Sequence, residues 1–232
     1  MNRSTRSAVR RLGMAGWACV AMLAGAPDAM AAPDEIVLSV RRIVSPHLTK
    51  PDVDSLCGEV DRIWAAYGVR IEWHEGTQMV APGDSAHLVV FVAPSDQCRP
   101  GRACGWLAAL ERVRNSYSQQ APAGRPDAVI TVSLPRAQRM ADAAFRAELA
   151  EAARTIWARA RLPILMGRAV AHEIGHYLLE SREHSANGLM RPHYMPHDAM
   201  QDRGYVLDAA QAARIHALWS QRTSLAVVGA AQ

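Results

Sequence analysis

Three histidines lie close together in the stretch 171-AHEIGHYLLESREHSANGLMR-191. His172 and His176 are four residues apart, and Glu173 directly follows the first. On a helix this spacing places both imidazoles on one face, where two ring nitrogens can reach one Zn²⁺ at about 2.0–2.1 Å each. Glu173 then lies beside the pair and can take a proton from a water molecule. The stretch therefore predicts an H-E-x-x-H zinc site with Glu173 as the general base.

A helix with histidines that are merely exposed or hydrogen-bonded is the alternative interpretation. The neighbouring Ile174, Leu178 and Leu179 are apolar, so the polar side chains among them need a shared partner. The apolar pattern then ends at Glu180, and His184 follows soon after it. Because a catalytic zinc takes three protein ligands and one water, a chain that turns back here would bring in His184 as the third ligand.

The stretch resembles the signature of the metzincin zinc metallopeptidases, H-E-x-x-H-x-x-G-x-x-H followed by a methionine turn. The residues that match its elements, in order, are His172, Glu173, His176, His184 and Met190. Ser185 corresponds to the serine that often follows the third histidine in matrixin-like members. The specific part of this resemblance covers residues 171–191.

Two features depart from that signature. The third histidine comes twelve positions after the first rather than ten, and Leu179 stands where the signature has glycine. Two additional residues lengthen the return path by a helical turn or a wider loop. The resulting spacing also resembles that of uncharacterised bacterial secreted proteins described as zinc proteases.

The resemblance implies a fold, a function and roles for individual residues. The fold is α+β: a zincin-like domain with a mixed sheet and a backing helix, a central motif helix, a methionine turn and a C-terminal helix. The function is that of a secreted zinc-dependent endopeptidase acting on a peptide or protein substrate. Met190 is expected to form a hydrophobic floor under the metal. Tyr194 is a candidate hydrogen-bond donor to an oxyanion, with a simply packed tyrosine as the alternative.

Two other functions are compatible with the same residues. One is a zinc amidase or hydrolase that acts on a cell-wall or other non-protein substrate. The other is a binding module that keeps the fold without catalysis. Glu173 argues against the binding module, because a site that only binds metal does not need a general base.

Other polar residues compete for the ligand positions. Glu180 or Glu183 could replace His184, although Glu180 lies too near the helix end to fold back easily. His193 and His197 are expected at the surface or on the substrate side. The remaining histidines stand alone in the sequence and are expected to be structural: His47, His74, His87 and His216.

The elements that must position the site belong to one domain, residues 32–222, with a frayed tail at 223–232. Periodicity and turn residues predict strands and helices in an α+β or α/β order. The expected strands are 35–44, 69–73, 86–93 and 128–134. The expected helices are 51–67, 137–159, 164–179 and one that begins at Asp208. Gly68 ends the first helix, Pro163 occupies the first turn of the third, and residues 86–93 form a central strand.

The N-terminal segment, residues 1–31, reads as a secretory signal peptide. Four arginines precede an apolar run, and Ala29-Met30-Ala31 supplies the small residues of a cleavage site. The apolar run is too short for a stable membrane anchor. A lipid anchor on Cys19 is the alternative, but the leucine usual three positions upstream is missing. We therefore expect a secreted or periplasmic protein.

The net charge and the cysteines bear on the possible partners and on the covalent structure of the protein. Residues 1–31 carry +3 of the formal charge of +4, which leaves +1 for the rest and gives no reason to expect a nucleic-acid partner. Three cysteines remain after cleavage, and an oxidising compartment favours a disulfide. Cys98 and Cys104 are the closest pair in sequence and the preferred one, with pairing of Cys57 to either of them as the alternative.

Overall fold

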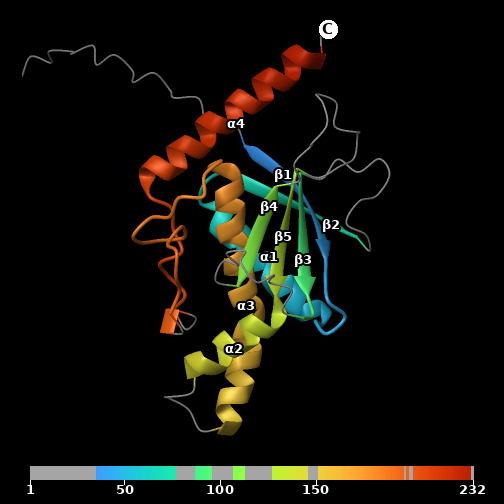
Figure 1. Cartoon of the computed structure of the whole chain (residues 1–232), viewed down its shortest axis with the longest axis vertical. Helices are drawn as coiled ribbons and strands as arrows, with labels where there is room; N and C mark the ends of the chain where they lie inside the picture. The colour runs from blue at the N-terminus through green and yellow to red at the C-terminus, as the bar shows by residue number, and fades with distance from the viewer. Residues whose placement is uncertain are drawn as a thin grey trace, which may run out of the picture. The chain divides into compact units, whose positions relative to one another are not determined.

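The chain divides into two units, Met1–Ala32 and Pro33–Gln232, and every described residue lies in the second. The computed structural model describes residues 35–76, 87–95, 107–112, 127–145, 151–195, 197–198 and 201–230. Within these ranges the fold is α+β, with five strands and four helices (Figure 1). The elements are β1 (Ile36–Ile43), α1 (Lys50–Ala65), β2 (Val69–Glu75), β3 (Leu88–Ala93), β4 (Ala108–Arg112), β5 (Ala128–Ser133), α2 (Leu134–Phe145), α3 (Glu151–Leu178) and α4 (Ala209–Ala230).

The strands form one mixed sheet in the order β2-β1-β3-β5-β4. The first four strands of this order are parallel, and β4 pairs antiparallel with β5 at one edge. The central position of β3 confirms the expectation from its apolar sequence, and Leu88, Val89 and Val90 are all buried. A strand with neighbours on both sides and cover on both faces reads as a continuous apolar run.

Helix α1 forms where the sequence predicts it, because local residues define both its start and its end. Thr49 caps the N-terminus in a capping box: its hydroxyl accepts a hydrogen bond from the Asp52 N–H, and the Asp52 carboxylate accepts one from the Thr49 N–H. Gly68 follows the last turn with a φ of 67°, the left-handed conformation that glycine adopts at little cost. The chain then enters β2 directly.

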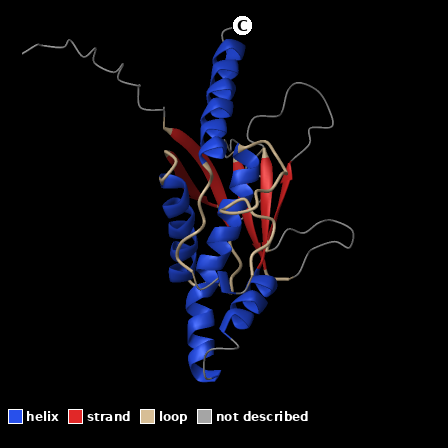
Figure 2. Cartoon of the chain, turned by 90° about the vertical axis from the view of Figure 1, so that its left-hand side faces the viewer, coloured by secondary structure: helices blue, strands red, loops and turns tan. Residues whose placement is uncertain are grey.

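Helices α1 and α3 pack against each other and on the sheet, with α1 against β2 and α3 against β4 and β5 (Figures 1 and 2). Polar contacts join α1 to the strands beneath it. Arg42 of β1 donates to Cys57 Sγ at 3.2 Å, and the Trp73 indole N–H donates to Asp61 at 2.9 Å. The core between these layers is made of aliphatic residues such as Leu38 and Ile130, both fully buried.

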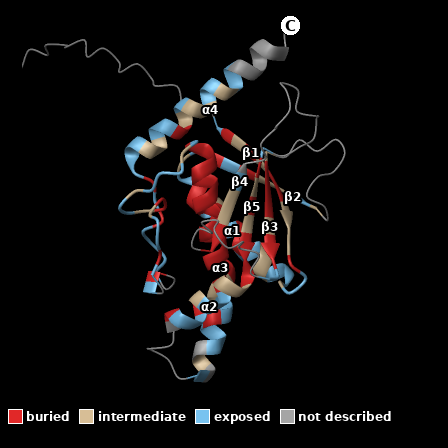
Figure 3. Ribbon diagram, viewed as in Figure 1, coloured by how far each residue is buried: buried red, intermediate tan, exposed pale blue. Residues whose placement is uncertain are grey.

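The helix that carries the histidines is longer than predicted. We expected helices 137–159 and 164–179 separated at Pro163, but this was wrong: Pro163 lies inside α3, and α2 ends at Phe145. An internal proline costs about 3 kcal/mol. Residues 165–179 are all buried, and each large apolar side chain among them contributes about 1.5–3 kcal/mol, so burial outweighs the proline (Figure 3).

Two other elements differ from expectation. Strand β4 was not predicted, because its five residues, AALER, form a short run without the alternation that marks a strand. The C-terminal stretch expected to fray from residue 223 continues as helix α4 to Ala230. The predicted cap of this helix is confirmed, since the Asp208 carboxylate accepts from the Gln211 N–H at 2.7 Å. Among the described residues, no helix is long and apolar enough to cross a membrane.

The predicted disulfide between Cys98 and Cys104 lies outside the described residues. Cys57 is a free, buried thiol, which removes the alternative pairings for this structure. Burial raises the pKa of Cys57, and this effect outweighs the hydrogen bond from Arg42. A buried thiol with a raised pKa is a weak nucleophile, so Cys57 acts as a packing residue of α1.

Candidate metal centre

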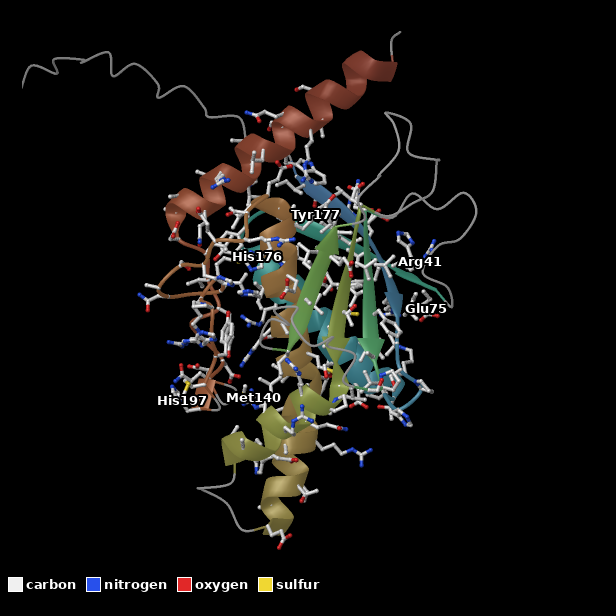
Figure 4. The ribbon with its side chains drawn as sticks, viewed as in Figure 1. Arg41, Glu75, Met140, His176, Tyr177 and His197 are labelled. Carbon is white, nitrogen blue, oxygen red and sulfur yellow. The ribbon has the colours of Figure 1, made fainter. Side chains whose placement is uncertain are left out.

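The three predicted histidines converge near the C-terminal end of α3. One ring nitrogen from each of His172, His176 and His184 lies within 4.8 Å of the others, which is close enough for one metal ion to be shared. His172 and His176 are buried on the helix, whereas His184 is exposed on the loop that follows it. Figure 4 shows His176 on the side of α3 that faces the 181–198 segment. The predicted return of the chain to a third position is therefore confirmed.

Backbone carbonyls fix the orientation of the two helical rings. His172 Nδ1 lies 2.7 Å from the Leu189 carbonyl oxygen, and His176 Nδ1 lies 2.8 Å from that of Ser181. A carbonyl can only accept, so each Nδ1 carries the proton and each neutral ring keeps its lone pair on Nε2. The two Nε2 atoms lie 3.0 Å apart. Two lone pairs at this distance repel unless a cation lies between them, so the donor set fits a metal such as Zn²⁺.

The environment keeps these histidines neutral, as metal ligands must be. The pKa of His172 is lowered to about 4, mainly by burial and in part by the neighbouring His176 and His184, against the hydrogen bond to Leu189. The pKa of His176 is also lowered, mainly by burial and in part by His184 and Arg182. Burial lowers the pKa of His184 as well.

Glu173 is a buried carboxylate on the motif helix, next to the histidines and the edge of the sheet. Glu173 is 6% exposed, and its pKa is raised to about 7 because burial outweighs the hydrogen bond from the Leu110 backbone. Because Leu110 belongs to β4, this bond connects the predicted general base to the edge strand. A carboxylate with a pKa near neutrality can both accept and release a proton at physiological pH.

The return path turns at Glu180, the second residue after the end of α3. Helix α3 ends at Leu178, and Glu180 adopts a φ of 50°, a left-handed conformation that is uncommon outside glycine. The chain then continues without regular secondary structure through residues 181–185 and places His184 beside the helix. The two additional residues of the motif thus form a wider loop, one of the two expected possibilities, and no further helical turn.

Met190, which the resemblance makes a floor under the metal, packs against the motif helix. It is fully buried, and its sulfur packs so closely against Gly175 that a Cβ at Gly175 would overlap it. Gly175 is the glycine between Glu173 and His176, so the methionine contacts the motif helix at the level of the ligands. The turn is closed by the Ser185 N–H, which donates to the Met190 carbonyl at 2.9 Å.

In this structure Tyr194 is a packed tyrosine, which was the alternative to a hydrogen-bond donor for an oxyanion. Its side chain is 3% exposed, and its hydroxyl donates to the Leu189 carbonyl, the same oxygen that receives the His172 N–H. Burial raises the pKa of Tyr194 far above its ordinary range. In this conformation the hydroxyl fixes a carbonyl that orients a ligand.

The competing ligands lie elsewhere. The Glu180 carboxylate accepts two hydrogen bonds from Arg222, at 2.8 Å and 2.5 Å. Glu183, His193 and His197 are exposed, and none belongs to the group of described residues whose ligand atoms converge. Two of the histidines interpreted as structural make backbone contacts: the Ser39 N–H donates to His87 Nδ1, and His216 Nε2 lies 2.9 Å from the Tyr67 carbonyl oxygen.

A second polar feature, not predicted from the sequence, lies one turn before His172. Arg168 is 1% exposed and donates to Glu59 of α1 at 2.7 Å, to the Asp198 carbonyl at 3.3 Å and to the Tyr205 hydroxyl at 3.1 Å. Its guanidinium also lies over the Tyr205 ring. These contacts tie the loop after Met190 to both helices. An arginine inside the apolar run of 165–171 was the available signal, because a buried charge needs partners.

A scan against protein-family models and a search of curated proteins found no match to this chain. The interpretation of the site therefore rests on its own residues and geometry.

Proposed function

We propose that this chain is a secreted zinc-dependent endopeptidase with a metzincin-like domain. The observation that carries the proposal is the convergence of three imidazole nitrogens within 4.8 Å, beside a buried glutamate. Two of the rings are oriented by backbone carbonyls, and a buried methionine packs against Gly175 of the same helix. Export is supported by the signal-peptide pattern of residues 1–31.

The roles of the residues follow from their positions. His172, His176 and His184 would hold Zn²⁺, which supplies a Lewis acid that polarises the scissile carbonyl and lowers the pKa of water. Glu173 accepts the proton of the attacking water and then donates it to the leaving amine. The Leu110 N–H keeps the carboxylate oriented while the proton is transferred.

We expect a peptide substrate to bind along the free side of the edge strand β4. Within the described sheet β4 has one neighbour, β5, and its Leu110 N–H reaches the general base. An extended peptide that paired with the other side of β4 would form main-chain hydrogen bonds and pass directly beside Glu173. Recognition through the main chain favours a peptide over a non-protein substrate.

The test combines metal content with hydrolysis for three proteins: wild type, Glu173→Ala and His184→Ala. Wild type is expected to contain close to one zinc per chain and to cleave a peptide library. Glu173→Ala should retain zinc and lose hydrolysis by a factor of about 10²–10⁴, because only the proton transfer is removed. His184→Ala should lose zinc, because it removes one of three ligands.

Several results would overturn the proposal. Wild type without metal after purification with zinc would refute the metal site. Full hydrolysis by Glu173→Ala would remove Glu173 from its role as base. Activity on peptidoglycan fragments with none on peptides would replace the endopeptidase by a cell-wall amidase.

A further inference from the structure

The loop between His176 and His184 begins with an unfavourable backbone conformation. Glu180 has a φ of 50°, and a left-handed conformation costs a non-glycine residue roughly 1 kcal/mol or more. Other contacts of Glu180 must offset this cost for the residue to keep the left-handed conformation. The nearby contacts identify what holds it.

Arg222 of α4, which lies 42 residues after Glu180 in the sequence, binds the Glu180 carboxylate. Its Nε and Nη2 both donate to Glu180 Oε1, at 2.8 Å and 2.5 Å. The same guanidinium lies 4.8 Å from the centre of the Tyr177 ring, whose hydroxyl donates to Asp127, the residue before β5, at 2.6 Å. Arg222 is therefore fixed by the end of α3 as well as by the carboxylate. In Figure 4, Tyr177 and His176 lie on the upper part of α3, below α4.

The residues around Glu180 connect this contact to the metal centre. Ser181, the next residue, offers the carbonyl that accepts the His176 Nδ1–H at 2.8 Å. Three residues further, His184 supplies the third ligand. Any rotation at Glu180 would shift the Ser181 carbonyl and change the distance from His184 to the two helical histidines.

We propose that Arg222 is a positioning residue of the metal centre, acting through Glu180 to set the return path that carries the Ser181 carbonyl and His184. This inference rests on the proposed function, because it assigns a role to Arg222 in the same metal site. In this view α4 completes the site, because the contact between Arg222 and Glu180 holds the backbone conformation that directs the chain toward His184.

The experiment measures the zinc affinity of the full chain by competition with a chromophoric chelator, and the absorption spectrum of the Co²⁺-substituted protein. Arg222→Met should weaken zinc binding about 10–100-fold, as loss of a residue that orients a ligand typically does, and should alter the Co²⁺ spectrum. Arg222→Lys, which retains the charge, should recover most of the affinity. The matched control is Arg214→Met, an exposed arginine on the same helix, which should bind zinc like wild type.

A double-variant cycle tests the path through Glu180. Glu180→Gly allows the left-handed conformation without a partner, so this variant should bind zinc close to wild type. In that background Arg222→Met should have little further effect. An equal loss in both backgrounds would overturn the inference, because Arg222 would then act by another route.

The two proposals fail in different ways. Unchanged zinc affinity in Arg222→Met would overturn the positioning role and leave the metallopeptidase proposal intact. A wild-type protein that binds neither zinc nor Co²⁺ would refute the metallopeptidase proposal itself. If circular dichroism shows that Arg222→Met is unfolded, Glu180→Gln replaces it, and unchanged affinity in that variant would overturn the inference.

Discussion

Two polar contacts lie at the two ends of the segment that carries the three histidines, and they differ in burial. Before the histidines, the Arg168 network joins Arg168 to Glu59, to the Asp198 carbonyl and to Tyr205. After them, the Arg222 pair joins Arg222 to Glu180. Arg168 and Glu59 are 1% and 9% exposed, whereas Arg222 and Glu180 are 30% and 41% exposed.

Because of this difference in burial, we expect the Arg168 network to affect the stability of the fold and the Arg222 pair to affect the local geometry of the loop. Breaking a buried ion pair leaves a charge without solvent or partner, which destabilises the fold strongly. Breaking a half-exposed pair lets water replace the partner, so the free energy of unfolding changes little. The Arg168 network should therefore stabilise the whole domain, and the Arg222 pair should act mainly on the local position of the loop.

The largest expected effect is that of Arg168→Met. Glu59 and the Asp198 carbonyl would lose their buried donor, and the free energy of unfolding should fall by roughly 3–5 kcal/mol. Arg161→Met is the matched control on the same helix: Arg161 pairs with the exposed Asp202, and its loss should cost about 1 kcal/mol or less. Denaturant unfolding measures both. Equal losses would remove the distinction between buried and exposed pairs.

A smaller effect with a distinct pH dependence is expected for Glu59→Gln. Burial raises the pKa of Glu59, but the hydrogen bonds from Arg62 and Arg168 outweigh it, so the pKa in the folded state lies below its ordinary value. The stabilisation is then complete above the pKa of the unfolded state and is lost as the pH falls through that of the folded state. Glu59→Gln should cost about 1.5–3 kcal/mol near pH 7 and much less near pH 3. A cost independent of pH would show that the carboxylate charge is not what stabilises the network.

The smallest expected effect on stability is that of Glu180→Gln. Removing the charge of a half-exposed pair should lower the free energy of unfolding by about 1 kcal/mol or less. The same unfolding measurement applies, alongside the zinc affinity of the variant. A loss as large as that of Arg168→Met would show that the Arg222 pair is a second stabilising network, contrary to the comparison.

Local patterns accounted for much of the fold. The sequence alone predicted β1, α1, β2, β3 and β5, because alternation, helical spacing and caps such as Thr49 and Gly68 act within a few residues. Predictions failed where burial competes with a local signal. Pro163 was interpreted as a helix boundary, yet burial of the following residues keeps α3 continuous. Strand β4 was missed because its five residues depend on pairing with β5.

The sequence by itself determined the chemistry of the centre: His172 and His176 share a helix face because α-helix geometry is local, and Glu173 lies beside them for the same reason. The tertiary structure decided how that chemistry is completed. The return of His184, the carbonyls of Ser181 and Leu189, and the Leu110 N–H at Glu173 depend on loops and strands whose positions are fixed elsewhere. The contacts that fix them join residues 42 and 109 positions apart, Glu180 with Arg222 and Glu59 with Arg168. No local pattern encodes such pairs, because their energy exists only once the helices are packed.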